Sequence, residues 1–313
     1  MMKKSIRKRR DTLKTITLII AGCILCLGIS ALISILANSK IRVAEYELSG
    51  RGADEAFNSD ELSIVLISDL HRAEFGEGNR CLIERTNEQD PDIICLVGDM
   101  LERDCTDDEL ESFCSLLSRF VEIAPTYLSC GNHDESLFGS GCEFYLGSDE
   151  RTIRERLEST GVIILDNEYV DTELSGQSLR IGGTIEYGFP LDSNPEGWAT
   201  SSAFTFLSDF CNTDRYKLLL CHRPDSFIFG DAAKIWDIDL VLSGHTHNGV
   251  VALPWGQAIY APDQGFLPQY ARGSFEIDKI HMIISGGLAG SQGVPRVFNP
   301  PEIVKISIRL NAE

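Results

Sequence analysis

Three apolar runs of strand length in the first half of the chain each end in a short polar motif. The runs are Leu62–Ile67, Asp92–Val97 and Thr126–Cys130. An alternation of apolar and polar residues would indicate a strand with one wet face, whereas a continuous run indicates a strand covered on both faces. The pattern therefore predicts a layered α/β fold in which these strands are buried.

The spacing of the polar motifs matches the length of βαβ units. Asp69 and Asp99 are 30 residues apart, and Asp99 and Asn132 are 33 residues apart, enough for a strand, a crossover helix and a second strand. Thr106 and Glu109 form a capping box ahead of apolar residues at helical spacing. Because the carboxyl ends of adjacent strands lie at one edge of an open α/β sheet, we expect the motifs to converge there.

The remainder of the chain predicts one more helix, an insert and further strands. Residues 149–160 are typical of a helix, and the mixed composition of Tyr187–Asp214 indicates an inserted loop with a short helix. Strands are expected around Val162–Leu165, Leu179–Ile181, Lys217–Cys221 and Ile238–Ser243. A second group of strands is expected at Val250–Leu253, Ala258–Tyr260, Ile280–Ile284 and Ile303–Ile308.

The polar motifs together supply seven side chains that can bind metal ions through nitrogen or oxygen. They are Asp69, His71, Asp99, Asn132, His222, His245 and His247. Seven such groups are too many for one tetrahedral zinc and suit two metals that share a carboxylate. Two metals about 3.5–4 Å apart are a common arrangement for in-line displacement at phosphorus. The motifs therefore predict a hydrolase of phosphate esters.

The order of these motifs resembles that of the calcineurin-like metallophosphoesterases. The pattern D-x-H, G-D, G-N-H-D, H and G-H-x-H is complete between Asp69 and His247. The resemblance implies a four-layer α/β sandwich, in which two mixed sheets pack face to face and are flanked by helices. Tyr260–Gly265 and Arg296–Glu302 are similar to the membrane-associated or exported branch, which is often named for UDP-diacylglucosamine hydrolases.

The resemblance also implies a role for each motif residue. One metal would be held by Asp69, His71 and His247, the other by Asn132, His222 and His245, and Asp99 would bridge the two. The metals would be divalent manganese, iron or zinc, because carboxylate and imidazole bind these ions without locking them up as thiolates would. A hydroxide shared by the metals would attack phosphorus in line. His133 would protonate the leaving oxygen and Asp134 would orient His133.

The N-terminus predicts a membrane anchor. Seven basic residues and one acid lie within residues 1–14, and Thr15–Asn38 follows without a charge, long enough to span a bilayer as one helix. The positive-inside rule places residues 1–14 in the cytoplasm and the domain outside the cell membrane. Residues 39–60 are expected to be a lead-in, irregular from residue 41, and residues 61–313 the catalytic domain.

Two other interpretations of this segment remain open. Arg9 and Arg10 resemble a twin-arginine export signal, although Thr12 stands where that signal usually has phenylalanine. A buried helix of a soluble protein is the other alternative. Because no convincing A-x-A cleavage site follows the apolar stretch, an uncleaved single-pass anchor is the preferred interpretation.

The net charge bears on the class of substrate, and the cysteines bear on burial and disulfide formation. The formal net charge is −19, and removing the +6 of the first 14 residues leaves −25 on the remainder, which disfavours a nucleic-acid partner. A metal-dependent nuclease and an inactive metal-binding module remain the alternatives, the second weakened because Asp99 and His133 are present. Of the cysteines, we expect Cys95, Cys130 and Cys221 to be buried. Others could pair outside the cell, namely Cys105, Cys114, Cys142 and Cys211.

The anchor makes lipid-linked phosphate esters natural candidate substrates. Aromatic residues of the insert could form an apolar wall for an acyl or isoprenoid chain: Tyr187, Phe189, Trp198, Phe204 and Phe206. The slightly favoured alternative is that they pack a small core of the insert itself.

Overall fold

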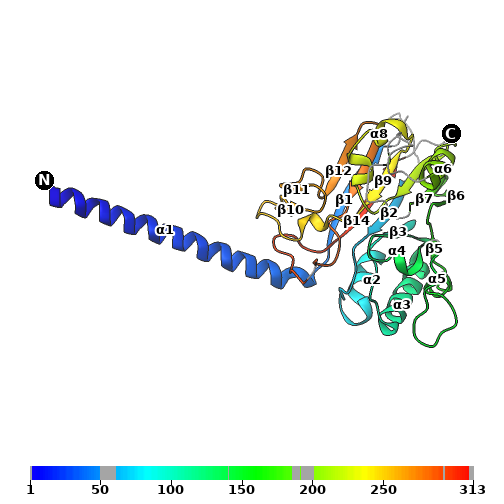
Figure 1. Ribbon diagram of the computed structural model, residues 1–313, viewed down its shortest axis with the longest axis horizontal. Helices are drawn as coiled ribbons and strands as arrows, with labels where there is room; N and C mark the ends of the chain where they lie inside the picture. The colour runs from blue at the N-terminus through cyan, green and yellow to red at the C-terminus, as the bar shows by residue number, and fades with distance from the viewer. Residues whose placement is uncertain are drawn as a thin grey trace.

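The computed structural model describes residues 2–49, 61–139, 141–184, 191, 201–291 and 293–309. A long helix, α1 (Met2–Leu36), extends from a domain of two sheets and short helices (Figure 1). The other helices are α2 (Arg80–Asn87), α3 (Asp107–Ile123), α4 (Glu135–Phe138), α5 (Ile153–Glu158), α6 (Ser201–Phe210), α7 (Asp225–Ile228) and α8 (Ala232–Ile235). Three 3₁₀ helices are η1 (Ala37–Ser39), η2 (Glu77–Asn79) and η3 (His247–Gly249).

Both large sheets are mixed and have six strands. The first has the order β1 (Arg42–Ser49), β14 (Glu302–Arg309), β2 (Glu61–Ile67), β3 (Ile93–Val97), β4 (Thr126–Ser129), β5 (Ile163–Ile164). The second has the order β12 (Gly273–Ile277), β13 (Ile280–Ile284), β9 (Leu240–Ser243), β8 (Tyr216–Leu220), β7 (Gln177–Gly183), β6 (Glu168–Leu174). The pair β10 (Tyr260–Ala261) and β11 (Gly265–Phe266) forms a separate small hairpin.

The apolar runs are continuous because alternate residues of each strand enter different cores. In β2, Ile64 and Leu66 pack between the two sheets, whereas Val65 and Ile67 pack against α2 and α3. A third core covers the outer face of the second sheet with α6, α7 and α8. The layers are therefore helices, sheet, sheet and helices, which confirms the four-layer fold.

Local predictions for the first half of the domain hold closely. The side chain of Thr106 accepts from the backbone of Glu109, and the Glu109 carboxylate accepts from the Thr106 N–H at 2.7 Å, so α3 begins with the expected capping box. The helix expected at 149–160 is α5, which begins with a second capping box at Thr152 and Glu155. All ten cysteines lie among the described residues and are free thiols; Cys95, Cys130 and Cys221 are buried as expected, and Cys105 is buried too.

Three predictions about strands were wrong. Residues 41–60 were expected to be irregular, but β1 occupies Arg42–Ser49 and pairs in parallel with β14. β1 is an edge strand that buries only Ala44 and Leu48. It therefore tolerates charged residues, and the sequence lacks the apolar run by which the other strands were predicted. Ile303–Ile308 belongs to the first sheet and not with Ile280–Ile284, which is β13 of the second. Within Val250–Leu253 the described backbone forms only isolated bridges.

The strand order fixes where α1 joins the domain. β14 runs antiparallel to β2, and β1 runs parallel to β14, so Arg42 at the start of β1 lies at the edge where β2, β3 and β4 end. Within Thr12–Leu36 an 18-residue window has a mean hydropathy of 2.7 and is not covered by the domain, so the helix is long and apolar enough to cross a membrane. The helix that could span a membrane thus meets the domain at the carboxyl edge of the central strands.

Candidate metal centre

The structure brings the polar motifs to this same edge from both sheets. Asp69 and His71 follow β2, Asp99 follows β3 and Asn132 follows β4. The second sheet contributes through β8 and β9, which are followed by His222 and by His245 and His247.

Six of the seven residues form two groups of potential metal ligands. Within each group the ligand atoms lie within 4.8 Å of one another; the groups are Asp69, His71 and His247, and Asp99, His222 and His245. Oδ2 of Asp99 lies 3.2 Å from Nε2 of His222 and 3.8 Å from Nε2 of His71, so it stands between the groups. These are the two sets expected from the motif resemblance, with Asn132 as the remaining member.

Two buried polar oxygens in the centre have unused lone pairs. No described residue donates a hydrogen bond to Oδ2 of Asp69 or to Oδ1 of Asn132, although the other oxygen of Asp69 accepts from the N–H of His245 at 3.0 Å. A buried carboxylate or amide oxygen without a partner is costly, and coordination of a cation would remove that cost. The donor set of carboxylate, amide and imidazole therefore fits divalent metals.

Backbone carbonyls orient two of the imidazole rings. Nδ1 of His222 lies 2.9 Å from the carbonyl oxygen of Val97, and Nδ1 of His247 lies 3.2 Å from that of Ala289. A proton on Nδ1 that is donated to a carbonyl turns Nε2 toward the centre as a lone-pair donor. Nε2 of His247 is accordingly 3.4 Å from Oδ1 of Asp69.

Burial and charge shift the pKa values of the predicted ligands in both directions. The pKa of His71 is raised, because burial is outweighed by the carboxylates of Glu102, Asp99 and Asp69. Burial lowers the pKa of His247 to about 4 and also lowers the pKa of His245. Burial opposes ionisation of Asp99, but the charges of His222 and His71 outweigh it and hold the pKa of Asp99 below its usual range. At neutral pH the centre therefore presents neutral His247 and ionised Asp99, the forms that bind metals.

The backbone at the centre is strained. Asp69, His71, Asp99, His245 and His247 have φ values of 53°, 46°, 53°, 68° and 49°, in the left-handed region that residues with a Cβ atom seldom adopt. Such conformations cost about 1–3 kcal/mol each and gather at functional sites, where the surrounding fold enforces them. The sequence did not predict this strain.

Glycines allow the strand-end loops to approach the carboxylates. A Cβ atom at Gly131 would lie 2.3 Å from Oδ1 of Asp99, and one at Gly244 would lie 2.6 Å from Oδ2 of Asp69. Gly287, which no motif marked, has φ +69° and would place a Cβ atom 2.8 Å from the side chain of Asp69. These glycines are therefore needed for space as well as for turns.

Glu102, and not Asp134, orients His133. Nδ1 of His133 lies 2.7 Å from Oε2 of Glu102, whose other oxygen lies 3.1 Å from Nδ1 of His71. The contact with His71 and then the hydrogen bond with His133, against partial burial, lower the pKa of Glu102 to about 2. The buried Asp134 carboxylate instead accepts the N–H groups of Met100 and Gly131 at 2.7 and 2.5 Å. The expected role of Asp134 was wrong: it braces the two loops that carry Asp99 and Asn132.

Sequence reasoning missed two acidic residues in this region. Glu102 is an acid three residues after Asp99 on the same strand-end loop, which was the available signal. Asp263 lies in the Tyr260–Gly265 segment, where Oδ2 is 3.2 Å from Nε2 of His245 and forms an ion pair with Arg223. Only the fold brings Asp263 to the centre.

A cleft of about 620 Å³ opens beside the first group of ligands. His71, Arg72 and Glu102 line one part, residues 288–290 and 293–296 line another, and Asn38, just beyond α1, also contributes. The side chain of His133 is 34% exposed, so a substrate can reach it.

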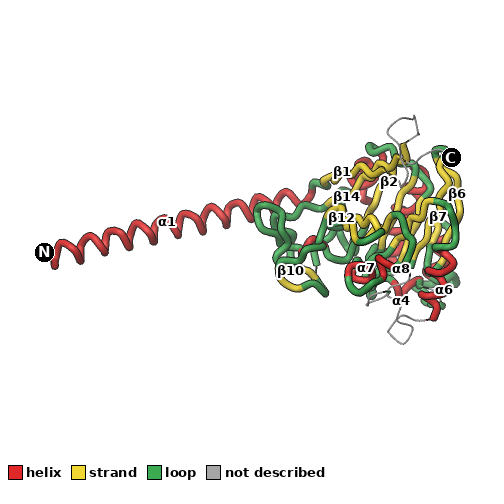
Figure 2. The backbone as a smooth tube through the Cα atoms, turned by 90° about the horizontal axis from the view of Figure 1, so that it is seen from above, coloured by secondary structure: helices red, strands yellow, loops and turns green. Residues whose placement is uncertain are grey.

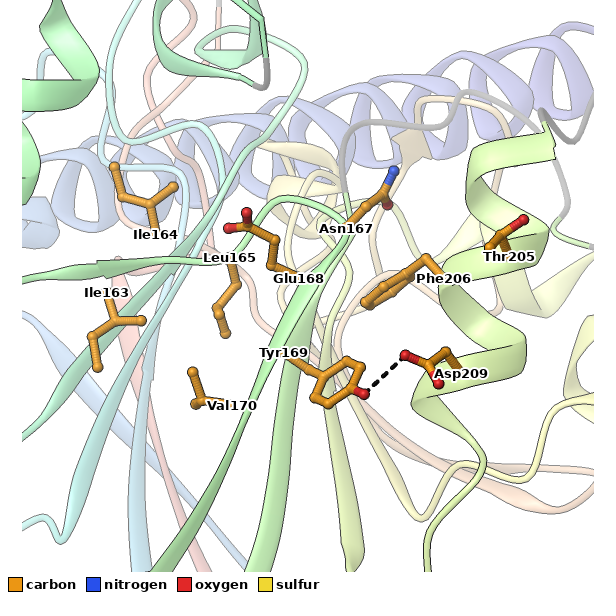
Figure 3. A pocket seen from close by; sticks show the side chains of 10 residues that line it. All are labelled: Ile163, Ile164, Leu165, Asn167, Glu168, Tyr169, Val170, Thr205, Phe206 and Asp209. Atoms are coloured by element: carbon orange, nitrogen blue, oxygen red, sulfur yellow. Dashed lines mark hydrogen bonds between the residues drawn. The ribbon is translucent and has the colours of Figure 1, made fainter.

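A second cavity of about 510 Å³ lies between β5, β6 and α6, and none of the predicted site residues lines it (Figure 3). The described aromatics of the insert lie on α6: Phe206 stacks on Phe210 at 5.7 Å, and Phe204 meets Trp236 edge-on at 5.1 Å. These contacts agree with packing of the outer core. Tyr187, Phe189 and Trp198 lie outside the described residues.

Comparison with known proteins identifies the family. An uncharacterized metallophosphoesterase of Campylobacter jejuni, Cj0846, is 30% identical over 253 residues, which are 80% of this chain and 59% of that protein. Phosphodiesterase YaeI of Escherichia coli is 27% identical over 253 residues, covering 80% of this chain and 83% of its own. The chain thus spans less than two thirds of the Campylobacter protein.

The family model described as calcineurin-like phosphoesterase matches residues 62–249. This range is more than half of the chain and includes all seven predicted metal ligands. The chain therefore belongs to the calcineurin-like phosphoesterase family.

Proposed function

We propose that this chain is a membrane-anchored hydrolase of phosphate esters that uses two divalent metal ions. The observation that carries the proposal is the pair of buried ligand groups on either side of Asp99. Asp69, His71 and His247 would hold one ion, Asn132, His222 and His245 would hold the other, and Asp99 would be shared. Manganese, iron and zinc all suit this donor set.

Two such ions activate water as a nucleophile and neutralise negative charge at phosphorus. The chain's own residues supply the remaining chemistry. His133 holds a proton on Nε2 for the leaving oxygen, and Glu102 fixes the ring by accepting from Nδ1 at 2.7 Å. The backbone N–H of His133 donates to Oδ1 of Asp99 at 2.8 Å, which ties the acid to the shared ligand.

The substrate class is a phosphodiester or a pyrophosphate, including lipid-linked forms. The net charge of −25 beyond residue 14 disfavours nucleic acids, whose backbones it would repel. The substrate name carried by the UDP-diacylglucosamine hydrolase branch stays a prediction. In this proposal residues 1–14 lie in the cytoplasm, and the domain lies outside a membrane crossed by α1.

The activity is tested with the full chain in detergent against an aryl phosphodiester, an aryl phosphomonoester and a pyrophosphate. We expect hydrolysis that a chelator abolishes and that added Mn²⁺ restores. Hydrolysis that resists complete removal of metal, or no hydrolysis of any ester after loading with manganese, iron or zinc, would contradict the proposal.

The orientation is tested with protease added to intact cells. We expect residues 39–313 to be cleaved while residues 1–14 stay protected. A protected domain would place it on the cytoplasmic side, and a mature chain that starts near residue 40 would show that the apolar segment is a cleaved signal.

A further inference from the structure

The end of α1 is bound directly to the loop that borders the catalytic cleft. The backbone N–H of Phe298 donates to Oγ of Ser34 at 2.6 Å, and Nδ2 of Asn38 donates to the carbonyl oxygen of Arg296 at 2.9 Å. Because these contacts fix the helix to the domain, a membrane crossed by α1 would lie against a defined side of the domain.

The same loop holds the backbone of a predicted metal ligand. Arg296 is 2% exposed, and its guanidinium donates to the carbonyl oxygens of His247, Asn299, Ala289 and Gly286. Nδ2 of Asn299 donates to the carbonyl oxygen of His247 at 2.7 Å. The position of the metal centre relative to the membrane helix is therefore set by part-buried hydrogen bonds at the end of α1 and buried ones within the loop.

A nearby stretch of the surface is apolar and almost uncharged. Residues 250–271 contain one charged residue in 22, Asp263, whereas 24% of the whole chain is charged. Within this stretch Trp255 is 75% exposed, Tyr260 49%, Phe266 80% and Leu267 62%. We call residues 253–268 the apolar loops.

Contacts within the apolar loops hold them together as one unit. The rings of Tyr260 and Phe266 meet edge-on at 5.4 Å, and Nε2 of Gln257 donates to the carbonyl oxygen of Pro268 at 2.9 Å. Asp263 in the same unit is paired with Arg223 and contacts His245. The exposed side chains are therefore held on a support that reaches the metal centre.

Figure 1 shows β10 and β11 at the end of the domain where α1 enters, and Figure 2 shows β10 there. Along the long axis shared by the two views, β10 lies level with the last turns of α1, on the side that faces the N-terminus. A bilayer crossed by Thr12–Leu36 would therefore reach the apolar loops.

We propose that the apolar loops are a second contact of this protein with the bilayer that α1 crosses. Tryptophan and tyrosine favour the interface between acyl chains and headgroups, because one part of each ring is apolar and another is polar. An acidic domain gains nothing from anionic lipid, so the contact depends on apolar insertion and is made with zwitterionic lipid.

With this contact in place, the cleft beside the metal centre faces the lipid headgroups. Asn38, next to the end of the membrane helix, lines the same cleft as His71 and Glu102, so a phosphate ester carried by a lipid would reach the metal centre without leaving the bilayer. This consequence rests on the proposed function, whereas the contact itself requires only that α1 crosses a membrane.

The contact is tested with the full chain in phosphatidylcholine nanodiscs whose acyl chains are brominated, a quencher of tryptophan fluorescence. The chain has three tryptophans, of which Trp236 is buried. We expect quenching that Trp255→Phe largely removes. Equal quenching in wild type and variant, or no quenching in either, would overturn the proposal.

The consequence is tested with the double variant Phe266→Ser, Leu267→Ser, both sites being exposed. We expect hydrolysis of a phosphate ester carried on a lipid in the nanodisc to fall by about tenfold, because positioning is lost, while hydrolysis of a soluble aryl phosphodiester stays unchanged.

The matched control is Phe144→Ser, a 45% exposed residue between α4 and α5, which lie away from α1 (Figure 1). Equal losses on both substrates, or full activity on the lipid ester, would overturn the role given to the apolar loops. If the wild type hydrolyses neither substrate, the proposed function fails while the quenching result stands.

Discussion

Two cavities of similar size show how differently this fold uses its surface. The cleft at the carboxyl edge, about 620 Å³, is lined by His71 of the first ligand group, and five of the six residues in the two groups have left-handed backbones. The cavity between β5, β6 and α6, about 510 Å³, is walled mainly by apolar side chains such as Ile163, Leu165 and Phe206 (Figure 3).

The polar contacts of the two cavities differ in kind. In the second cavity the hydroxyl of Tyr169 donates to Asp209 at 2.9 Å, and the guanidinium of Arg180 lies over the Tyr169 ring. The polar groups of Tyr169, Asp209 and Arg180 therefore have partners in one another. At the cleft, buried oxygens of Asp69 and Asn132 lack a donor among the described residues. Cavity volume therefore does not distinguish a candidate functional site from another hollow of the surface. A cluster of polar groups with strained backbones and unsatisfied hydrogen bonds does distinguish it.

The strongest test of this contrast is Asp99→Asn. We expect turnover to be abolished and binding to weaken at both metal positions, because the variant removes the ligand that the two groups share. Metal content by inductively coupled plasma mass spectrometry and hydrolysis of an aryl phosphodiester measure the two effects. The matched control is Asp209→Asn in the second cavity, which should leave both unchanged; full metal occupancy in Asp99→Asn would refute the shared role.

His133→Ala separates metal binding from catalysis at the metal centre. We expect the metals to be retained while the rate falls by about 10²–10⁴-fold, the usual contribution of a positioned acid. The same two measurements apply. Near-normal turnover would show that this histidine does not protonate the leaving group, and loss of metal would make it a ligand.

Glu102→Gln examines the partner that the structure adds to His133. We expect a loss of about 10–100-fold in rate or metal affinity, since the side chain contacts both His133 and His71. Asp134→Asn should instead lower the midpoint of thermal unfolding, because its buried carboxylate accepts from the Met100 and Gly131 backbone. Wild-type turnover in Glu102→Gln would show that Glu102 is not needed to orient the His133 ring.

The smallest expected effect compares two glycines with similar backbones. Gly287 has φ +69° and no room for a Cβ atom beside Asp69, whereas Gly176 has φ +71° with nothing within 4 Å. Gly176→Ala should cost only the backbone strain, about 1 kcal/mol. Gly287→Ala should cost about 1–3 kcal/mol more through overpacking. Equal shifts in thermal unfolding followed by circular dichroism would mean that crowding at the centre contributes nothing.

Short-range signals carried the sequence predictions that the structure reproduced. Each continuous apolar run became a strand because both of its faces are covered, and the Thr106 capping box marked the start of α3. The motif residues could be read because each follows such a strand at once, and the fold class followed from the order of the motifs. Their individual roles remain predictions that the variants above address.

What only the tertiary structure decided involves residues far apart in the chain. Arg42 pairs with Glu302, and the side chain of Ser34 accepts a hydrogen bond from the backbone of Phe298. Because these partners are far apart in the chain, no local sequence pattern predicts that β1 and β14 place the end of α1 at the edge where the ligands meet. Asp263 reaches His245 and Gly287 packs against Asp69 for the same reason. A strand can be predicted from its own residues because the burial of its apolar side chains leaves a local pattern in the sequence. The long-range contacts depend instead on the strand order of the two sheets and on the space left between their loops.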